Sequence, residues 1–458
     1  MAAGITTLSR AGPVPAGGSA RQRGLAAVLI AAAVAACSPV RTVEAVRLLS
    51  GLAGDPRERA AEAEARRLEI AYAVEDRPRR ADVYPPDGTA RAALVVVPGA
   101  AEEGRRDPRL IAFAGGLTRA GFLVLVPELA GDDQLQISAD DAVAIADGVR
   151  HLTAAAEVPE VGLAALSYAV GPTVLAALYE DTRPRVRYIL AIGGYYDIVA
   201  GIAYITTGAF RADPAEPWRY GEVDQRARWI FLRANADRLD DPADVRLLTE
   251  MAERRVRDPG AGVADLAARL GDDGRAVYRL FVNADPDRVP ELIAALPAAF
   301  REQIEALDLA RRDLGRLDAD LILIHGRNDP MVPHTESLKL AGAVPPNRAD
   351  VYLLDDLRHV DLGTPAAGDA WTMVRAAYRL LEARDAAPAP AASPVAAAWR
   401  EGGRVRIAAG GGRRRRFGAE RLPARRVHPS GPAPSPRGAV TARSVWAAGG
   451  MHLRRWIG

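Results

Sequence analysis

The sequence predicts an α/β fold: a mostly parallel, doubly wound sheet with helices on both faces. Between about residues 68 and 197, short apolar runs alternate with amphipathic stretches at intervals suited to strand, helix, strand units. The apolar runs are nearly continuous, which is typical of strands buried on both faces. From about residue 198 to 317 the strand signals stop and helical spacing takes over. We therefore expect a sheet domain interrupted by an inserted helical cap domain.

The first half of the sheet domain is expected over residues 68–197, the cap over 198–317 and the second half over 318–384. The expected strands are 68–74, 80–84, 92–97, 122–126, 160–165, 188–192, 321–324 and one that begins near 351. The expected helices are 108–119 and 139–155 in the first half, and 223–238, 242–256, 263–270, 287–296 and 300–314 in the cap. In such sheets, reactive groups gather at the carboxyl ends of the strands.

Ser167 stands where a short apolar strand gives way to a helix-like segment, with small residues around it. A sharp strand-to-helix turn exposes the serine Oγ and places the first helical N–H groups near any developing negative charge. This position suits a nucleophile, although a serine with small neighbours can also be a simple turn residue.

Asp329 and His359 follow two later apolar strands. Asp329 lies among turn-forming residues after the strand at 321–324, and His359 follows the strand that begins near Val351. The chain order is therefore serine, aspartate, histidine, and the last two stand 30 positions apart. An imidazole can take the serine proton, and a carboxylate can orient the imidazole, so these three residues are candidates for nucleophilic catalysis.

On these residues, the chain from about Ile70 to Ala383 resembles the α/β-hydrolases. The resemblance rests on Ser167, on the segment from His325 to Pro333 around Asp329, and on His359. It implies that the backbone N–H groups of Tyr168 and of Ala100 or Ala101 form the oxyanion hole. The chain departs from the family at Ala165 and Ala169, where glycines are usual, and at Pro98, where many members have histidine.

The resemblance implies a serine hydrolase that cleaves an ester or related acyl bond of a small-molecule substrate without a cofactor. Acyl transfer to another alcohol, or peptide cleavage, remains open on the same triad. The substrate pocket under the cap has four aromatic candidates, each of which could instead serve packing: Tyr195, Tyr196, Trp218 and Tyr220. A rival from a different class is a non-catalytic exported lipoprotein that uses the scaffold for binding.

The other titratable residues have less specific interpretations. Asp355 and Asp356 could supply the carboxylate for His359, although both lie close to the strand end. His325 is expected to pack beneath the acid loop, whereas surface or capping positions are expected for His151 and His334. No two histidines stand at ligand spacing, so we expect no metal site.

The amino-terminal region resembles a bacterial lipoprotein signal. An uncharged apolar run from Leu25 to Ala36 follows several arginines and ends at Cys37, the only cysteine of the chain. The run is short for a membrane-spanning helix but suits a signal peptide. We expect residues 1–37 to be a signal with a lipobox, Cys37 to be lipidated, and the protein to be exported and held on the membrane of the cell envelope. An ordinary signal peptide or an uncleaved anchor is the alternative.

Two further segments complete the expected organisation. Residues 38–67 carry helical spacing with many charges and suggest a tether or surface helix. Residues 385–458 hold 14 arginines and three acidic residues, a charge of +11 that masks a negative body in a chain of net charge +2. They lack periodic apolar spacing, so we expect a disordered basic tail. Binding of acidic surfaces by this tail is a third functional idea, but the arginine bias does not lead us to expect nucleic acid as a partner. The sequence gives no oligomeric state.

Overall fold

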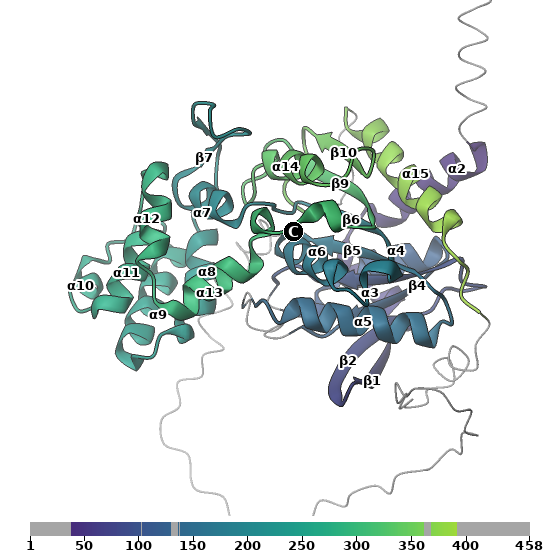
Figure 1. Ribbon diagram of the computed structural model, residues 1–458, viewed down its shortest axis with the longest axis horizontal. Helices are drawn as coiled ribbons and strands as arrows, with labels where there is room; N and C mark the ends of the chain where they lie inside the picture. Colours follow the sequence, from purple (N-terminus) through teal and green to yellow (C-terminus); the bar gives the residue numbers. More distant parts are fainter. Residues whose placement is uncertain (1–37, 102, 130–135, 137, 361–367, 392–458) are drawn as a thin grey trace, which may run out of the picture.

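An eight-stranded sheet forms the centre of the computed structural model, which describes residues 38–101, 103–129, 136, 138–360 and 368–391 (Figure 1). The strand order is β1-β2-β4-β3-β5-β6-β9-β10. β2 is the one strand that runs opposite to the others in this sheet, so the expected mostly parallel sheet is confirmed. The strands are β1 (Leu68–Val74), β2 (Arg77–Tyr84), β3 (Ala92–Val97), β4 (Phe122–Pro127), β5 (Val161–Leu166), β6 (Val186–Ile192), β9 (Asp320–Gly326) and β10 (Ala349–Leu354).

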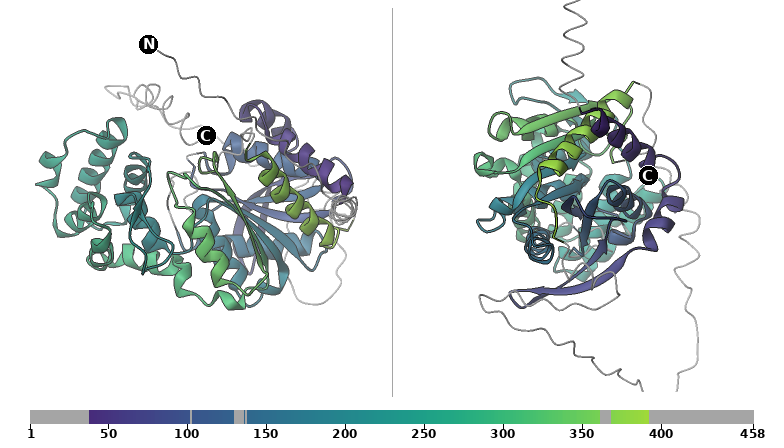
Figure 2. Two further views of the ribbon diagram at one scale, coloured as in Figure 1. Left: turned by 90° about the horizontal axis from the view of Figure 1, so that it is seen from above. Right: turned by 90° about the vertical axis from the view of Figure 1, so that its right-hand side faces the viewer.

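Helices cover both faces of this sheet (Figures 1 and 2). One face holds α5 (Asp141–Ala155), α6 (Val170–Leu178) and α14 (Thr335–Ala343). The other holds α2 (Pro39–Leu52), α3 (Pro56–Glu64), α4 (Pro108–Arg119) and α15 (Ala370–Ala386). Strand β3 shows why its sequence is apolar throughout: Val95 and Val97 enter one hydrophobic cluster, and Leu94 and Val96 enter the other.

Residues 198–306 form a helical unit beside the sheet domain (Figure 1). The cap was expected to reach residue 317, but four leucines at its end are buried in the hydrophobic cluster of the sheet domain: Leu307, Leu309, Leu314 and Leu317. Its helices are α7 (Ile198–Thr207), α8 (Ala227–Asn235), α9 (Pro242–Arg257), α10 (Ala264–Ala267), α11 (Asp272–Phe281), α12 (Val289–Ala294) and α13 (Ala298–Leu307). They share a hydrophobic cluster of their own that includes the buried Trp229. Helices α7 and α11 were not among the expected helices. The unit also contains a short hairpin, β7 (Ala209–Phe210) with β8 (Arg219–Tyr220), so the expectation that strands stop here was wrong in this detail.

The two amino-terminal helices pack on the sheet domain rather than forming a free tether. Helix α2 lies against α15, and α3 lies against α4. Ala63 approaches α4 so closely that a Cβ added at Gly115 would lie 2.6 Å from the Ala63 Cβ. Glycine at 115 therefore permits this helix contact. The segment 38–67 belongs to the folded body.

Ion pairs join the first and last described helices. The Arg384 guanidinium, 1% exposed, donates to Glu44 at 2.5 Å, and Arg41 donates to Asp385 at 3.1 Å. Helix α15 continues to Ala386, and the Ala391 N–H donates to the Ala156 carbonyl at 3.1 Å. Ordered backbone thus extends past residue 385, where the tail was expected to begin.

Within the described ranges, no helix combines the length and apolar character needed to cross a bilayer. The expected signal with Cys37 and the tail beyond residue 391 lie outside the described residues.

Candidate active site

Three side chains that are far apart in the sequence meet at the carboxyl ends of the parallel strands. His359 Nε2 lies 2.7 Å from Ser167 Oγ, and His359 Nδ1 lies 2.9 Å from Asp329 Oδ2. Ser167 follows β5, Asp329 follows β9 and His359 follows β10. These are the three residues that the sequence singled out as candidate nucleophile, acid and base.

Ser167 occupies a strained turn. Its φ of 55° lies in the left-handed region, which costs a residue other than glycine about 1–3 kcal/mol. The turn connects β5 to a short 3-10 helix, Ser167–Ala169, and then to α6. Ala165 and Ala169, which stand where the hydrolase pattern has glycine, are both fully buried. The close packing around this turn is therefore compatible with alanine at both positions.

The Asp329 carboxylate is buried and held on several sides. Its Oδ1 accepts the N–H groups of Met331 at 2.8 Å and Val332 at 3.0 Å, and the side chain is 1% exposed. Burial opposes ionisation, but the charge and hydrogen bond of His359 outweigh it and hold the pKa of Asp329 below its ordinary value of 3.8. The carboxylate is therefore negatively charged at neutral pH.

This carboxylate fixes the hydrogen-bond direction through His359. An ionised carboxylate only accepts, so His359 Nδ1 must carry a proton and donate it to Asp329. When Nε2 carries no proton, its lone pair faces the Ser167 hydroxyl at 2.7 Å. The arrangement can draw the proton from serine and stabilise the imidazolium that results.

The loop after β3 lies against the nucleophile turn. A Cβ built on Gly99 would stand 3.1 Å from the Leu166 carbonyl oxygen and 3.6 Å from the Ser167 Cβ. Ala100 and Ala101 follow directly and are half-buried. Tyr168 is fixed by its hydroxyl, which accepts the Ser138 N–H at 2.8 Å. These contacts place the expected oxyanion segments beside Ser167, and the donor role of Tyr168, Ala100 and Ala101 stays a prediction.

Arg105 anchors the far end of the same loop. Its side chain is 6% exposed and donates to the buried Asp82 at 2.5 Å and to Glu69 and Glu128 at 3.3 Å each. Removing one partner from such a buried pair typically costs about 3–5 kcal/mol. The sequence does not single out Arg105, because an arginine in a charged stretch is typical of the protein surface.

Two more residues around the acid and base were also missed. Gly193, at a φ of 64°, follows β6, and an added Cβ would lie 3.3 Å from His359 Nδ1 and 3.5 Å from Asp329 Oδ2. The Tyr204 hydroxyl donates to the Asp329 backbone carbonyl at 2.8 Å. The glycine pair 193–194 directly after a strand was the available signal for the first. No sequence pattern around Tyr204 predicts its contact with Asp329.

The four aromatic pocket candidates differ in burial and in hydrogen-bond partner. Tyr195 is buried, and its hydroxyl donates to the Leu307 carbonyl at 3.1 Å, so its ring belongs to the core. Tyr196 is half-buried, and its backbone N–H donates to Glu336. Trp218 donates to Asp287, and Tyr220 on the short hairpin is 66% exposed. A pocket role for these residues stays a prediction.

The remaining titratable candidates have structural partners. Asp355 pairs with Arg327 at 3.0 Å, and the backbone N–H groups of Asp355 and Asp356 donate to Asp369. His325 is fully buried beneath the acid loop, as expected, with Nδ1 2.7 Å from Ser337 Oγ. His334 stands at the N-cap position of α14.

His151 is buried, so the surface or capping position expected for it was wrong. It is 5% exposed and stacks on Tyr72 with the ring centroids 4.2 Å apart. The helix that carries it, α5, is buried along most of its length, so the surface expectation fails there.

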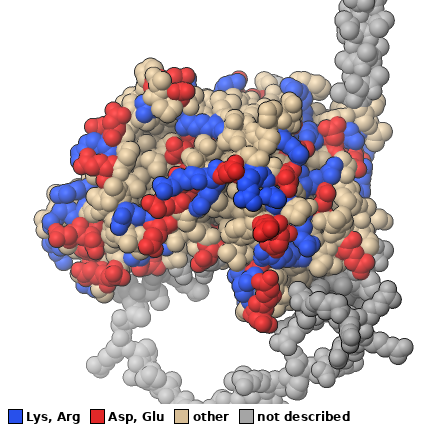
Figure 3. All heavy atoms as spheres, in the orientation of Figure 1, with Lys and Arg blue, Asp and Glu red and all other residues tan. Residues whose placement is uncertain are grey.

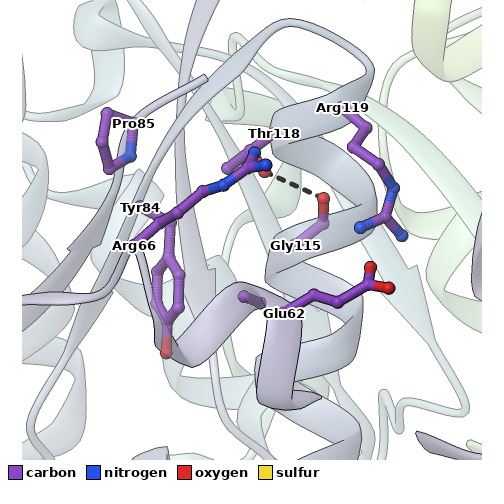
Figure 4. Close-up of a pocket in the computed structure, with 8 residues that line it drawn as sticks. Glu62, Arg66, Tyr84, Pro85, Gly115, Thr118 and Arg119 are labelled. Carbon is purple, nitrogen blue, oxygen red and sulfur yellow. Dashed lines mark hydrogen bonds between the residues drawn. The ribbon is translucent and has the colours of Figure 1, made fainter. Parts of the chain in front are cut away.

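Within the described part of the chain, no group of three His, Cys, Asp or Glu side chains is placed to hold a metal ion. A small surface pocket lies away from the triad, between α3, α4 and the end of β2 (Figure 4). Its lining includes Glu62, Arg66 and Arg119. Because β2 runs opposite to the parallel strands, its last residue, Tyr84, lies toward their amino ends, opposite Ser167.

Strand order, the single antiparallel strand and the positions of the three side chains after β5, β9 and β10 together define the α/β-hydrolase fold. The resemblance inferred from the sequence is confirmed at the level of the fold.

No family model and no curated protein matches the chain. Solved structures do resemble it. A candidate hydrolase from Legionella pneumophila is 13% identical, with 70% of this chain and 88% of that chain covered and a TM-score of 0.42. A bacterial membrane phospholipase A is 18% identical, with 80% and 100% covered and a TM-score of 0.39. The esterase RhEst1 from Rhodococcus sp. ECU1013 is 14% identical, with 69% and 98% covered and a TM-score of 0.37.

Proposed function

We propose that the protein is a serine hydrolase that cleaves an ester or related acyl bond through an acyl-enzyme on Ser167. The observation that carries the proposal is the continuous hydrogen-bonded chain from Ser167 through His359 to Asp329. Supporting it is the strained backbone of Ser167, because such strain persists where the surrounding structure enforces it and is frequent at reactive positions.

In the proposed reaction, Ser167 Oγ attacks the substrate carbonyl carbon while its proton passes to His359 Nε2. The imidazolium is held by Asp329, and the oxyanion accepts hydrogen bonds from the N–H groups of Tyr168 and of Ala100 or Ala101. Each such donor is worth about 3 kcal/mol in the transition state. The leaving alcohol takes the proton from His359 as the acyl-enzyme forms. A water molecule then gives a proton to His359 and attacks the acyl carbon, and Ser167 regains its proton when the carboxylic acid departs.

A fluorophosphonate probe tests the nucleophile. We expect covalent labelling of the folded protein, none in Ser167→Ala and a strong decrease in His359→Ala. Ser50→Ala and His334→Asn are matched controls, because both side chains lie outside the hydrogen-bonded triad, and both variants should label like the parent. Folded protein that hydrolyses no chromogenic ester and takes no label would instead support a non-catalytic binding role.

The substrate class within acyl chemistry is a separate question. A screen of chromogenic esters of increasing chain length, with amide and peptide substrates and an added alcohol acceptor, separates esterase from peptidase and acyltransferase. We expect ester hydrolysis to dominate, because esters present the lower barrier. Activity confined to peptides, or product formed only with the alcohol, would leave the triad in place but change the assigned reaction.

We propose further that the protein is exported and anchored to the cell envelope through a lipid on Cys37. The support is the apolar run that ends at the only cysteine of the chain. Cys37→Ser is expected to lose lipid labelling and to leave the membrane fraction. Identical fractionation of this variant and the parent would contradict the anchor. Removing residues 392–458 tests the basic tail. Unchanged activity and fractionation would exclude a role of the tail in either.

A further inference from the structure

Helix α2 carries an exposed row of valines. Among the described residues, seven large hydrophobic side chains are exposed, and three of them lie on this helix: Val40 is 70%, Val43 50% and Val46 46% exposed. Their spacing of three residues places them along one side of the helix. Ala45 and Leu48, on the other side, are buried against the sheet domain. The helix is thus apolar toward solvent as well as toward the core, which calls for a partner.

The start of α2 is fixed to the folded body. The Ser38 N–H donates to the Tyr378 hydroxyl at 2.9 Å, and the Arg41 guanidinium donates to Asp385 at 3.1 Å and to Tyr378 at 3.1 Å. Ser38 is also the N-cap of the helix. Cys37 directly precedes Ser38 in the chain, and consecutive Cα atoms are about 3.8 Å apart. A lipid on Cys37 would therefore have no flexible linker between itself and α2.

We infer that the valine face of α2, formed by Val40, Val43 and Val46, lies in the surface of the lipid bilayer and holds the protein flush against the membrane. The inference goes beyond the proposed hydrolase activity and uses the proposed anchor at Cys37 to choose the membrane as the occupant. A lipid attached to the residue before the N-cap of a fixed helix brings the first turns of that helix to the bilayer. Valine side chains gain free energy by leaving water there.

Charge on α2 is compatible with this placement. Arg47 is exposed and follows Val40 by seven residues, so it lies on the same side of the helix and can meet anionic headgroups. Elsewhere basic and acidic side chains are interspersed over the face in Figure 3. The neighbouring helix α15 carries Trp371, 66% exposed, and tryptophan favours the membrane interface.

The test uses the full chain, produced in a bacterium that processes lipoproteins and reconstituted into vesicles of phosphatidylethanolamine and phosphatidylglycerol. Val43→Cys places a thiol for a polarity-sensitive dye on the valine face, and Glu291→Cys on α12 is the control. Since Cys37 is the only native cysteine and its sulfur is occupied when lipidated, each dye reports one site. We expect a blue shift on reconstitution at position 43 and none at position 291. Equal, water-like emission at both sites in vesicle-bound protein would overturn the inference while leaving the anchor intact.

A second arm separates the valine face from the anchor. In a Cys37→Ala background, replacing Val40, Val43 and Val46 together by serine should weaken vesicle binding at least about tenfold. Val282→Ser, which removes another exposed valine at the end of α11, should leave binding unchanged. If the parent proves not to be lipidated, binding that still depends on the three valines supports the face by itself, and binding that ignores them overturns it. A blue shift at position 43 without vesicles would also overturn it, by showing that protein covers the face. Dependence of that shift on concentration would identify a second copy, and independence would identify another segment of the chain.

Discussion

The sheet domain and the helical cap encode function in different ways. In the sheet domain, Ser167, Asp329 and His359 each follow a strand, and the parallel arrangement brings the strand ends to one edge. In the helical unit, Trp218 donates to Asp287 and Tyr220 is 66% exposed on the short hairpin, and neither residue follows a strand of the large sheet. Residues placed by topology can be found from a sequence, whereas residues placed by helix packing are found only in the structure.

The largest difference should appear when the acid is altered. Asp329→Asn keeps the shape of the side chain but removes the charge that orients and stabilises protonated His359. We expect kcat to fall by about 10⁴-fold, the size typical of this change in serine triads. Steady-state hydrolysis and circular dichroism of the variant measure this, with Asp355→Asn as the matched control. A tenfold loss or less would mean that another group orients His359.

Acid should weaken the sheet domain through His151. Burial lowers its pKa from 6.5 to about 4. Below pH 6.5 the His151 imidazole therefore binds a proton in the unfolded chain but not in the folded chain. The free energy of unfolding falls as a result until about pH 4. The loss amounts to at most about 3.5 kcal/mol at ~1.4 kcal/mol per pH unit.

Denaturant titrations at several pH values measure this slope. His151→Phe should flatten it, because phenylalanine can keep the stack on Tyr72 without titrating. Tyr72→Phe, the control, should keep the slope. An unchanged slope in His151→Phe would assign the acid sensitivity to other groups.

A glycine-to-alanine substitution in each region should give a smaller difference in activity. Gly193→Ala puts a methyl group against His359 and forces alanine into a left-handed backbone, at a cost of about 1–2 kcal/mol. We expect kcat to fall about tenfold, measured by ester hydrolysis of folded protein. Gly201→Ala in α7 is the control, because an added Cβ there meets nothing within 4 Å. Equal activities of the two variants would contradict the role given to Gly193.

The smallest effect is expected at the hairpin. Tyr220→Ala removes a ring that is 66% exposed and should change kcat/KM by less than about twofold, as for most surface substitutions. Kinetics with short and long esters check this. A large rise in KM with long esters alone would show that the hairpin contacts substrate and would restore the pocket prediction for this residue.

Much of the sheet domain could be predicted, because continuous apolar runs identify doubly buried strands. The expected strands 68–74 and 92–97 and the helix 108–119 match β1, β3 and α4 residue for residue. The triad candidates could be found because chain order and strand ends are visible in the sequence. Arg105 and Tyr204 could not, since their contacts with Asp82 and Asp329 join segments that no local pattern connects. Helices α7 and α11 were overlooked because α7 is apolar nearly all round, which hides the helical period, and α11 opens with two aspartates and a glycine, which are typical of a turn.

The ion pairs between the first and last described helices set a limit on how far the chain can be shortened. A recombinant form that stops after residue 391 retains Arg384 and Asp385 and should keep α2 docked. One that stops at residue 383 loses both, and Glu44 and Arg41 are then left without these partners. Protease sensitivity near residue 53, between α2 and α3, would reveal the detached helix.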